Sequence, residues 1–162
     1  MNRKSFTLIE VLLSVFLITV SVLGLYSGIN YSYSSVTKAS DKFVASYLAE
    51  EGVELVKNIR DSNFVNGNVS WVEGLTTCSD IILGCRMDYD ESALTVNTLS
   101  TVRTPLWIDA NGFYNYTESG TQTIFSRKIV VTIVSSAKIK ISVTVYYGEE
   151  EFLLEQYLYN WK

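Results

Sequence analysis

The sequence contains no histidine, and it has only one proline and two cysteines among its 162 residues. Histidine is the commonest general base and metal ligand, so its absence removes the usual basis for both kinds of site. The chain also lacks a Gly-x-Ser-x-Gly motif, a phosphate-binding loop and a metal-spaced set of cysteines. A Ser–Lys or carboxylate-pair enzyme would leave no such motif, but nothing in the sequence supports one. We therefore expect a protein that is not an enzyme and that needs no cofactor.

Basic residues are few, and their distribution is uneven. The chain has 13 Lys and Arg residues against 17 Asp and Glu residues, which gives a net charge of −4. An acidic chain has no electrostatic attraction to phosphate backbones, so we expect no specific nucleic-acid partner. Arg3 and Lys4 lie at the N-terminus, and the next basic residue is Lys38.

A long apolar run separates these basic residues. The run Phe6–Tyr26 has 21 residues and one charged side chain, Glu10. A helix of about 20 apolar residues crosses a bilayer, so the run is long enough to span a membrane. With Arg3 and Lys4 before it, the positive-inside rule places the N-terminus in the cytoplasm and the rest of the chain outside. Charged residues within spans are rare and usually functional, so Glu10 is a candidate functional residue.

Two simpler interpretations fit the run less well. A secretory signal peptide has an apolar region of about 7–15 residues followed by a small-residue cleavage site. This run is longer, and Gly24–Gly28 matches such a site poorly. An ordinary signal anchor has the right length but leaves Glu10 unexplained.

The segment Lys4–Leu12, with the sequence KSFTLIEVL, resembles the processing site of type IV prepilins and type II secretion pseudopilins. In that family, a prepilin peptidase cuts before the phenylalanine and methylates the new N-terminal amine, and the fifth mature residue is glutamate. The resemblance implies cleavage between Ser5 and Phe6, N-methylation of Phe6 and a role in assembly for Glu10. Ser5 stands where the family usually has glycine, and a small residue should still fit a tight peptidase site.

The physical chemistry of Glu10 agrees with this resemblance. An unpaired carboxylate deep in a membrane costs about 2.5–3.5 kcal/mol, which the helix dipole offsets slightly near an N-terminus. In a filament, Glu10 would meet the cationic amine of Phe6 in a neighbouring subunit. That pair would neutralise two buried charges and fix the axial register. The alternative is a carboxylate that reaches the membrane surface without a partner.

The helical pattern continues beyond the apolar run, because no proline precedes Pro105. Gly24 and Gly28 are weak points, each costing about 1 kcal/mol relative to alanine, which would permit local melting during assembly. The segment Tyr31–Val36 is either continuous helix or a frayed joint. A continuous helix from Phe6 to Arg60 would be about 80 Å long.

From Ala39 onward the apolar residues recur at three- and four-residue spacing, which predicts an amphipathic helix ending near residues 60–63. These residues are Val44, Leu48, Gly52, Leu55 and Ile59.

Glu50, Glu51 and Glu54 form an acidic cluster near the end of this helix. The cluster is either a cation or acid–base site or a solvated helix face with Lys57 and Arg60 within reach. We favour the solvated face, because oppositely charged side chains at helical spacing pair on helix surfaces.

Residues 62–105 are rich in small and polar residues, which predicts loops with short strands. Cys78 and Cys85 lie in this region with six residues between them. In an exported chain such a pair suggests one disulfide, contributing about 2–3 kcal/mol; in the cytoplasm the two would be free thiols. Ile81–Leu83 lies between the cysteines, either as a buried plug or as an exposed contact.

The next segment, Leu106–Tyr116, has the pattern of strand, turn and strand. Asp109 and Asn111 faintly resemble the start of a calcium loop, and some pseudopilins bind calcium. The downstream ligands of such a loop are missing, and turn chemistry explains these residues, so we favour the turn.

The last third of the chain alternates apolar and polar residues over 129–134 and 138–147, and a further strand is predicted at 152–159. This pattern predicts an antiparallel meander whose apolar face packs on the amphipathic half of the helix. Lys138 and Lys140 form either a small basic patch for DNA or pilus partners or, as we favour, the solvent face and edge protection of a strand. The expected fold class is α+β and pilin-like, with a long N-terminal helix on a C-terminal antiparallel sheet.

The chain should therefore have four parts: a leader at residues 1–5, a membrane and assembly half of the helix at 6–28, an amphipathic half at 29–61 and a β-rich head at 62–162. We expect a structural subunit, minor rather than major, of a type IV pilus or related filament. The alternatives are a pseudopilin of a type II secretion system, a competence pilin and a plain signal-anchored binding domain.

The resemblance also implies partners and a location. The partners would be other pilin subunits, prepilin peptidase, the inner-membrane assembly platform and, before assembly, membrane lipid. The chain would first cross the inner membrane once, with its N-terminus in the cytoplasm. After assembly it would belong to a filament at the cell surface or in the periplasm.

Overall fold

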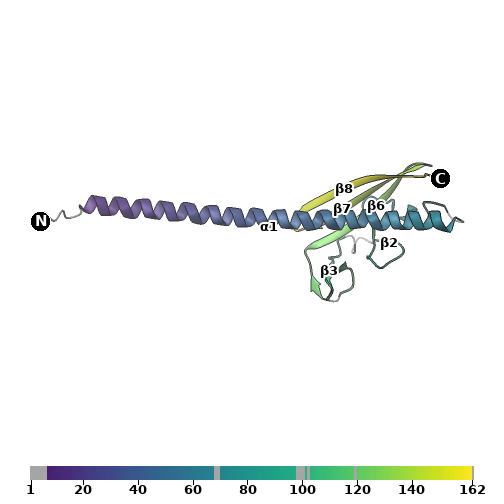
Figure 1. Cartoon of the computed structure of the whole chain (residues 1–162), viewed down its shortest axis with the longest axis horizontal. Helices are drawn as coiled ribbons and strands as arrows, with labels where there is room; N and C mark the ends of the chain where they lie inside the picture. Colours follow the sequence, from purple (N-terminus) through teal and green to yellow (C-terminus); the bar gives the residue numbers. More distant parts are fainter. Residues whose placement is uncertain (1–6, 68–69, 98–100, 102, 119, 162) are drawn as a thin grey trace. The chain divides into compact units, whose positions relative to one another are not determined.

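The computed structural model describes residues 7–67, 70–97, 101, 103–118 and 120–161. The chain divides into two compact units, Met1–Ser40 and Asp41–Lys162. The first element is a single helix, α1, at Leu8–Asn66, and antiparallel strands and loops follow it (Figure 1). The predicted α+β fold class, with a long N-terminal helix packed on antiparallel sheet, is confirmed.

In the first unit, α1 is regular throughout, and Tyr31–Val36 is continuous helix rather than a frayed joint. The hydroxyl groups of Ser14, Thr19 and Ser21 each donate a hydrogen bond to the carbonyl oxygen four residues earlier, at 2.6–2.7 Å. These bonds satisfy the polar side chains within an apolar segment, so the helix needs no outside partner for them.

In the second unit, α1 continues three residues beyond its predicted end, to Asn66. The buried ring of Phe64 explains the extra turn, since it lies 6.3 Å from the ring of Trp71 and 4.7 Å from that of Trp161. Gly67 then ends the helix with a positive φ of 68°, and its amide donates to the carbonyl oxygen of Asn63 at 3.2 Å. A glycine in this conformation is a common helix C-cap.

The main sheet has five antiparallel strands in the order β2-β1-β6-β7-β8. Three long strands form the predicted meander, and β6 begins four residues earlier than expected. The strands are β1 (Cys85–Arg86), β2 (Thr95–Val96), β6 (Phe125–Ser135), β7 (Lys138–Tyr147) and β8 (Glu150–Tyr159).

A second, small sheet has three strands in the order β4-β3-β5. The strands are β3 (Trp107–Ile108), β4 (Tyr114–Asn115) and β5 (Thr121–Gln122), and a short 3-10 helix, η1, lies at Thr76–Cys78. The turn between β3 and β4 is the one predicted: one carboxylate oxygen of Asp109 accepts the amides of Asn111 at 2.8 Å and Phe113 at 3.0 Å.

The core of the second unit forms where one face of α1 packs on the three long strands, which run along the helix in Figure 1. A Cβ atom added at Gly52 would lie 3.0 Å from Cγ1 of Val143, so the missing side chain lets helix and sheet approach closely. The fully buried side chains at this contact are Ala45, Leu48, Ala49, Val53 and Val56 from the helix and Ile129, Val131, Ile139, Ile141, Val143 and Val145 from the strands.

The predicted edge role of Lys138 and Lys140 is wrong, because β7 lies between β6 and β8 and has no free edge. Both residues alternate with the buried side chains of β7 and are half-exposed. Lys140 pairs with Glu155 of β8 at 3.0 Å, and the ammonium of Lys138 lies 3.9 Å from the ring centre of Tyr157. These cations are thus matched to cross-strand neighbours.

Candidate assembly surface

The apolar run is exposed along the first unit. Every aliphatic or aromatic side chain from Leu8 to Tyr26 is between 51% and 79% exposed. By length and composition, α1 contains a segment able to cross a membrane, and no part of that segment is buried against the rest of the chain. A surface of this size and polarity needs lipid or other protein to cover it.

Glu10 lies in the first turn of this helix. The amides of Glu10 and Val11 donate to the carbonyl oxygen of Thr7, at 3.1 and 3.3 Å, so the helix starts just before the carboxylate. The positive end of the helix dipole therefore favours a negative charge here. Ser5 and Phe6, the residues of the expected cleavage and methylation site, lie outside the described residues. The pairing of Glu10 with the amine of Phe6 in a second subunit stays a prediction.

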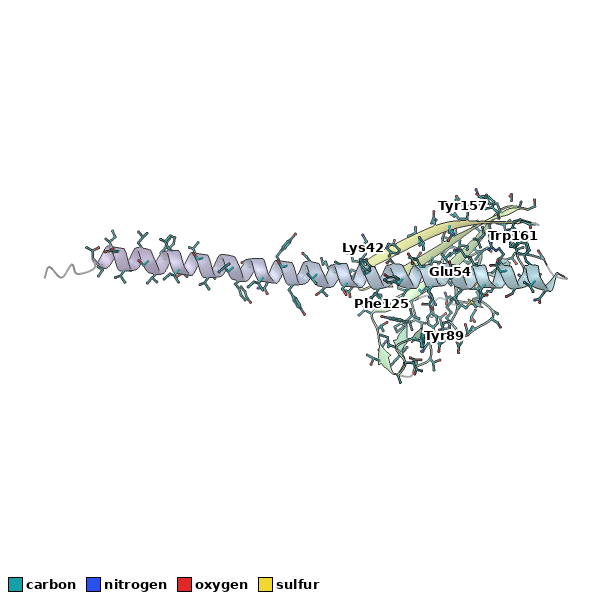
Figure 2. All side chains as sticks on the ribbon, viewed as in Figure 1. Lys42, Glu54, Tyr89, Phe125, Tyr157 and Trp161 are labelled. Atoms are coloured by element: carbon teal, nitrogen blue, oxygen red, sulfur yellow. A yellow bond between two sulfur atoms is a disulfide. The ribbon has the colours of Figure 1, made fainter. Side chains whose placement is uncertain are left out.

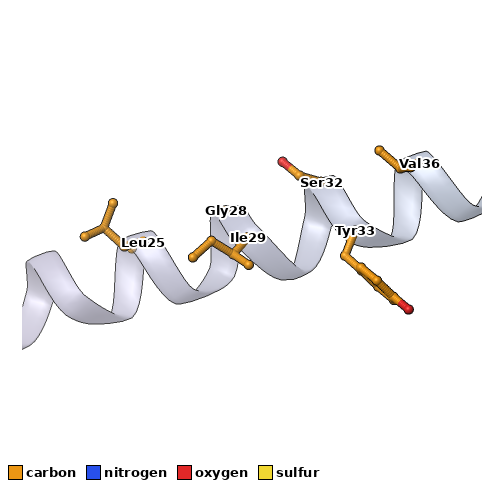
Figure 3. Close-up of a pocket in the computed structure, with 7 residues that line it drawn as sticks. Leu25, Gly28, Ile29, Ser32, Tyr33 and Val36 are labelled. Atoms are coloured by element: carbon orange, nitrogen blue, oxygen red, sulfur yellow. The ribbon is translucent and has the colours of Figure 1, made fainter.

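A shallow groove follows one side of the helix in the first unit, where Gly24, Gly28 and Ser32 are spaced four residues apart (Figure 3). Larger side chains border it: Leu25, Ile29, Tyr33 and Val36. A Cβ atom added at either glycine would meet nothing within 4 Å, so the fold of this chain does not itself require glycine there. Small residues at this spacing are typical of membrane helices that pack closely. Local melting at the glycines stays a prediction.

Cys78 and Cys85 form the disulfide expected for an exported chain, with their Cα atoms 5.4 Å apart. The segment between them is not a buried plug, because Ile81 and Ile82 are 74% and 71% exposed. Asp80 orders the loop: one of its carboxylate oxygens accepts the amides of Ile82 and Leu83, at 2.7 and 3.0 Å. These two hydrogen bonds hold the pKa of the Asp80 carboxyl below its ordinary value of 3.8.

Arg127 has a buried side chain in the head, at 2% exposure, and was not predicted as a buried charge from the sequence. Its guanidinium donates to the carbonyl oxygens of Leu48 at 3.1 Å and Met87 at 2.7 Å, and it lies 3.4 Å from a carboxylate oxygen of Glu51. Its own carbonyl accepts the hydroxyl of Tyr116 at 2.9 Å. Arg127 thereby joins α1, the loop after β1 and strand β6. Its position in the strand was the available signal, because it lies at two-residue spacing from Phe125, Ile129 and Val131 and therefore on their face of β6.

The acidic cluster on α1 is a paired helix face, as the favoured interpretation expected, although the partners differ. Glu54 pairs with Lys57 at 2.7 Å, whereas Arg60 pairs with Asp61 at 2.7 Å. Glu51 instead faces the buried guanidinium described above. Glu51 and Glu54 thus pair with different partners, Glu50 is exposed, and the three carboxylates are not arranged to hold a metal ion.

A second group of carboxylates surrounds Asp88. Burial raises the pKa of Asp88, and the nearby charges of Glu91 and Asp90 raise it further, against the hydrogen bond that its carboxylate accepts from the amide of Tyr116 at 2.8 Å. Asp109, at the same pocket, already accepts two backbone amides in its turn. Within the described part of the chain, no group of three His, Cys, Asp or Glu side chains is arranged to hold a metal ion.

Comparison with known proteins concerns the N-terminal segment. A family model described as the prokaryotic N-terminal methylation motif matches residues 1–26. This motif is the signature of type IV pilins and pseudopilins, and the chain carries it at its N-terminal end. No curated protein and no solved structure matches the chain. The match covers residues 1–26, which include the apolar run, while the head is characterised by its fold alone.

Proposed function

We propose that this protein is a structural subunit, and a minor one, of a type IV pilus or related filament, made as a membrane-anchored precursor. The observation that carries the proposal is the combination of the methylation motif at residues 1–26 with a helix whose apolar side chains are exposed from Leu8 to Tyr26. An exposed apolar helix can lie in a bilayer first and pack among neighbouring helices later.

The second unit is consistent with a precursor that is first anchored in a membrane and later assembled into a filament. Its core uses helix residues from Ala45 onward and is complete without the apolar run. The head can therefore fold outside the membrane while residues 6–28 remain in lipid. By the positive-inside rule, Arg3 and Lys4 support an N-terminus in the cytoplasm. The disulfide between Cys78 and Cys85 is consistent with a head in an oxidising compartment.

Processing at the Ser5–Phe6 bond by prepilin peptidase would free the amine of Phe6 next to the first helical turn. In the filament, Glu10 of one subunit would pair with the methylated amine of Phe6 in the next. Both groups would otherwise carry unpaired charge into an apolar surrounding, so the pair selects one axial register. Other pilin subunits and the inner-membrane assembly platform are the partners of this step.

The mass of the mature chain tests the proposal. We expect loss of Met1–Ser5 and the addition of one methyl group, both dependent on a prepilin peptidase in the same cells. A Ser5→Gly variant should be processed at least as completely, because glycine is the usual family residue, and a Ser5→Leu variant should remain unprocessed. A chain that keeps Met1 in cells with active peptidase would show a plain signal anchor instead.

Abundance separates the kinds of subunit. A minor subunit should be scarce relative to the major pilin in sheared filaments, and its deletion should leave the filament composed of other pilins. Abundance equal to that of the filament as a whole would identify a major subunit. Dependence of protein secretion, rather than of surface filaments, on this chain would identify a pseudopilin.

A further inference from the structure

Strand β8 is an open edge of the main sheet. The order β2-β1-β6-β7-β8 leaves β8 bonded on one side only, and no other strand of the described chain pairs with its outer side. The strand lies at the outer margin of the sheet in Figure 1, and Tyr157 is labelled on it in Figure 2. An edge of this kind presents backbone donors and acceptors that can pair with another chain.

The register identifies the backbone groups at this edge. In an antiparallel ladder, hydrogen-bonded pairs alternate with pairs that are not hydrogen-bonded. The amide of Asn160 donates to the carbonyl oxygen of Ala137 at 2.9 Å, one residue beyond the last pair of β7 and β8. Pairs two residues apart share this state, so the even-numbered residues of β8 bond to β7. The odd-numbered residues direct their N–H and C=O groups away from β7, and they are Glu151, Leu153, Glu155, Tyr157 and Tyr159.

The edge of β8 lacks the features that usually protect an exposed strand. Natural edge strands are kept short, bulged, covered, or interrupted by proline or lysine. β8 has 10 residues, all paired with β7 without a shift in register, whereas the opposite edge strand, β2, has 2 residues. The sequence of β8 contains neither proline nor lysine. A long, straight edge that is left open favours a partner that pairs with it.

The side chains of β8 define the chemistry of such a partner. On the core face of the sheet, Phe152 and Leu154 pack against the core but are only half-buried. On the other face, Leu153 and Tyr159 are each 54% exposed. Side chains on neighbouring strands contact each other on the same face of a sheet. A strand with apolar residues at alternate positions would therefore complete the cover of Phe152 and Leu154.

An acidic turn adds a charge requirement at one end of the edge. Glu149, Glu150 and Glu151 are consecutive, exposed residues where β7 turns into β8. Within the described part of the chain, none of these three carboxylates belongs to an ion pair. Opposite charges on neighbouring strands stabilise pairing, so a partner strand with lysine or arginine beside this turn fits best.

We propose that β8 is the docking edge for an extended segment of a different protein, which joins the five-stranded sheet as an additional strand. The segment has apolar residues at alternate positions and a lysine or arginine beside the turn at Glu149–Glu151. A second copy of β8 has no basic residue to place there. Backbone hydrogen bonds supply affinity in strand addition, and alternate side chains supply specificity. The inference concerns the folded head, so it does not depend on the proposed filament function.

A synthetic peptide tests the edge on the purified full chain in detergent. The peptide matches β8 in length, alternates valine with threonine, and carries lysines at the end that meets the acidic turn. We expect binding that slows amide hydrogen exchange at the odd-numbered residues of β8, because the even-numbered amides are already protected by β7. The same peptide with glutamates in place of the lysines should bind roughly tenfold more weakly. Protection that is absent, or that is not confined to this edge, would overturn the proposal.

Leu153→Pro is the blocking variant, and Leu153→Ala is its matched control. The N–H of Leu153 points away from β7, so proline removes a donor of the open edge and no hydrogen bond of the ladder. Alanine removes the same leucine side chain but keeps the N–H. We expect roughly tenfold weaker peptide binding for proline and at most about threefold for alanine. Equal binding by the two variants would overturn the proposal, and the exchange pattern of the native chain tests the edge if the proline variant does not fold.

Photo-crosslinking in cells that express the full chain identifies the natural partner. A photoreactive amino acid replaces Tyr157, and the control position is Ile133, which is 53% exposed on the inner strand β6. We expect a junction from residue 157 to an extended segment of a different protein. This junction should disappear in the Leu153→Pro chain and persist in the Leu153→Ala chain. A junction to a second copy or to lipid, one that survives proline, or a yield no higher than at position 133 would overturn the proposal.

Discussion

Replacement of Arg127 is the most informative test of how the head is held on the helix. Arg127→Ala removes the hydrogen bonds to the carbonyl oxygens of Leu48 and Met87, leaves Glu51 without its cation, and opens a cavity between α1 and β6. Arg127→Lys keeps a positive charge and most of the alkyl chain. A single ammonium lacks the two-pronged geometry with which the guanidinium reaches two carbonyls on different elements.

The expected magnitudes follow from these contacts. Each hydrogen bond from a charged donor contributes about 1.5–3 kcal/mol, and breaking a buried charge pair costs about 3–5 kcal/mol. Glu51 is one-third exposed, so the loss of its ion pair with Arg127 adds little to the destabilisation. The Nε atom of Arg127 has no hydrogen-bond partner among the described residues, which already reduces the benefit of the native arrangement. We expect a loss of about 3–4 kcal/mol for alanine and about 1.5–3 kcal/mol for lysine.

The assay is equilibrium unfolding of the full chain in detergent, followed by tryptophan fluorescence. Two of the three tryptophans, Trp71 and Trp161, pack around Phe64 at the end of the helix. Lys128→Ala is the matched control: it is the next residue of β6, half-exposed, and should cost at most about 1 kcal/mol. A loss below about 1 kcal/mol for Arg127→Ala, or no difference between the lysine variant and the native chain, would refute the reasoning.

Three further predictions concern the disulfide, a buried carboxyl and the assembly residue. Reduction of the Cys78–Cys85 disulfide, or its replacement by two serines, should lower the free energy of unfolding by about 2.5 kcal/mol, the loop-entropy value for a ring this small; equal midpoints with and without reductant would contradict it. Asp88→Asn should raise stability at pH 7. Burial raises the pKa of Asp88 above 3.8 in the folded chain, so the native chain loses stability as the pH rises through that pKa. The stability advantage of the variant should therefore vanish below pH 3.8. An advantage that persists in acid would show that it does not come from the charge of Asp88. Glu10→Ala should leave membrane insertion and head folding unchanged but abolish entry into filaments, and a variant incorporated at the native level would show that Glu10 does not set the register.

The long elements were predictable because their patterns are long. Ten alternating residues of β7 define its buried face from Ile139 to Tyr147, and the helical spacing from Val44 to Ile59 defines the face of α1 that meets it. The end of the helix was missed because the packing of Phe64 against Trp71 comes from tertiary structure, which local spacing does not contain.

Of the short strands, only β3 and β4 could be located from the sequence, because the predicted turn lies between them. Strands β1 to β5 have two residues each, too few for any periodicity, and β1 is held by pairing with β6 more than 40 residues later in the chain. The edge assignment of Lys138 and Lys140 failed for the same reason, because neighbour order is a property of the whole sheet. Arg127 was missed because a positive charge on the buried face contradicts the expectation that Arg lies outside.

The hydroxyl groups of Ser14, Thr19 and Ser21 have a consequence for the transfer of the helix from a bilayer into a bundle of helices. Each is already bonded to the backbone of its own helix. Moving this part of the helix sideways out of a bilayer and into a bundle would therefore require none of these hydrogen bonds to break. Transfer of the apolar surface from lipid to protein then changes the free energy of these hydroxyl groups little, in either direction. A preference for the assembled state has to come from another group. The carboxylate of Glu10 is the one charge in the run that can supply it.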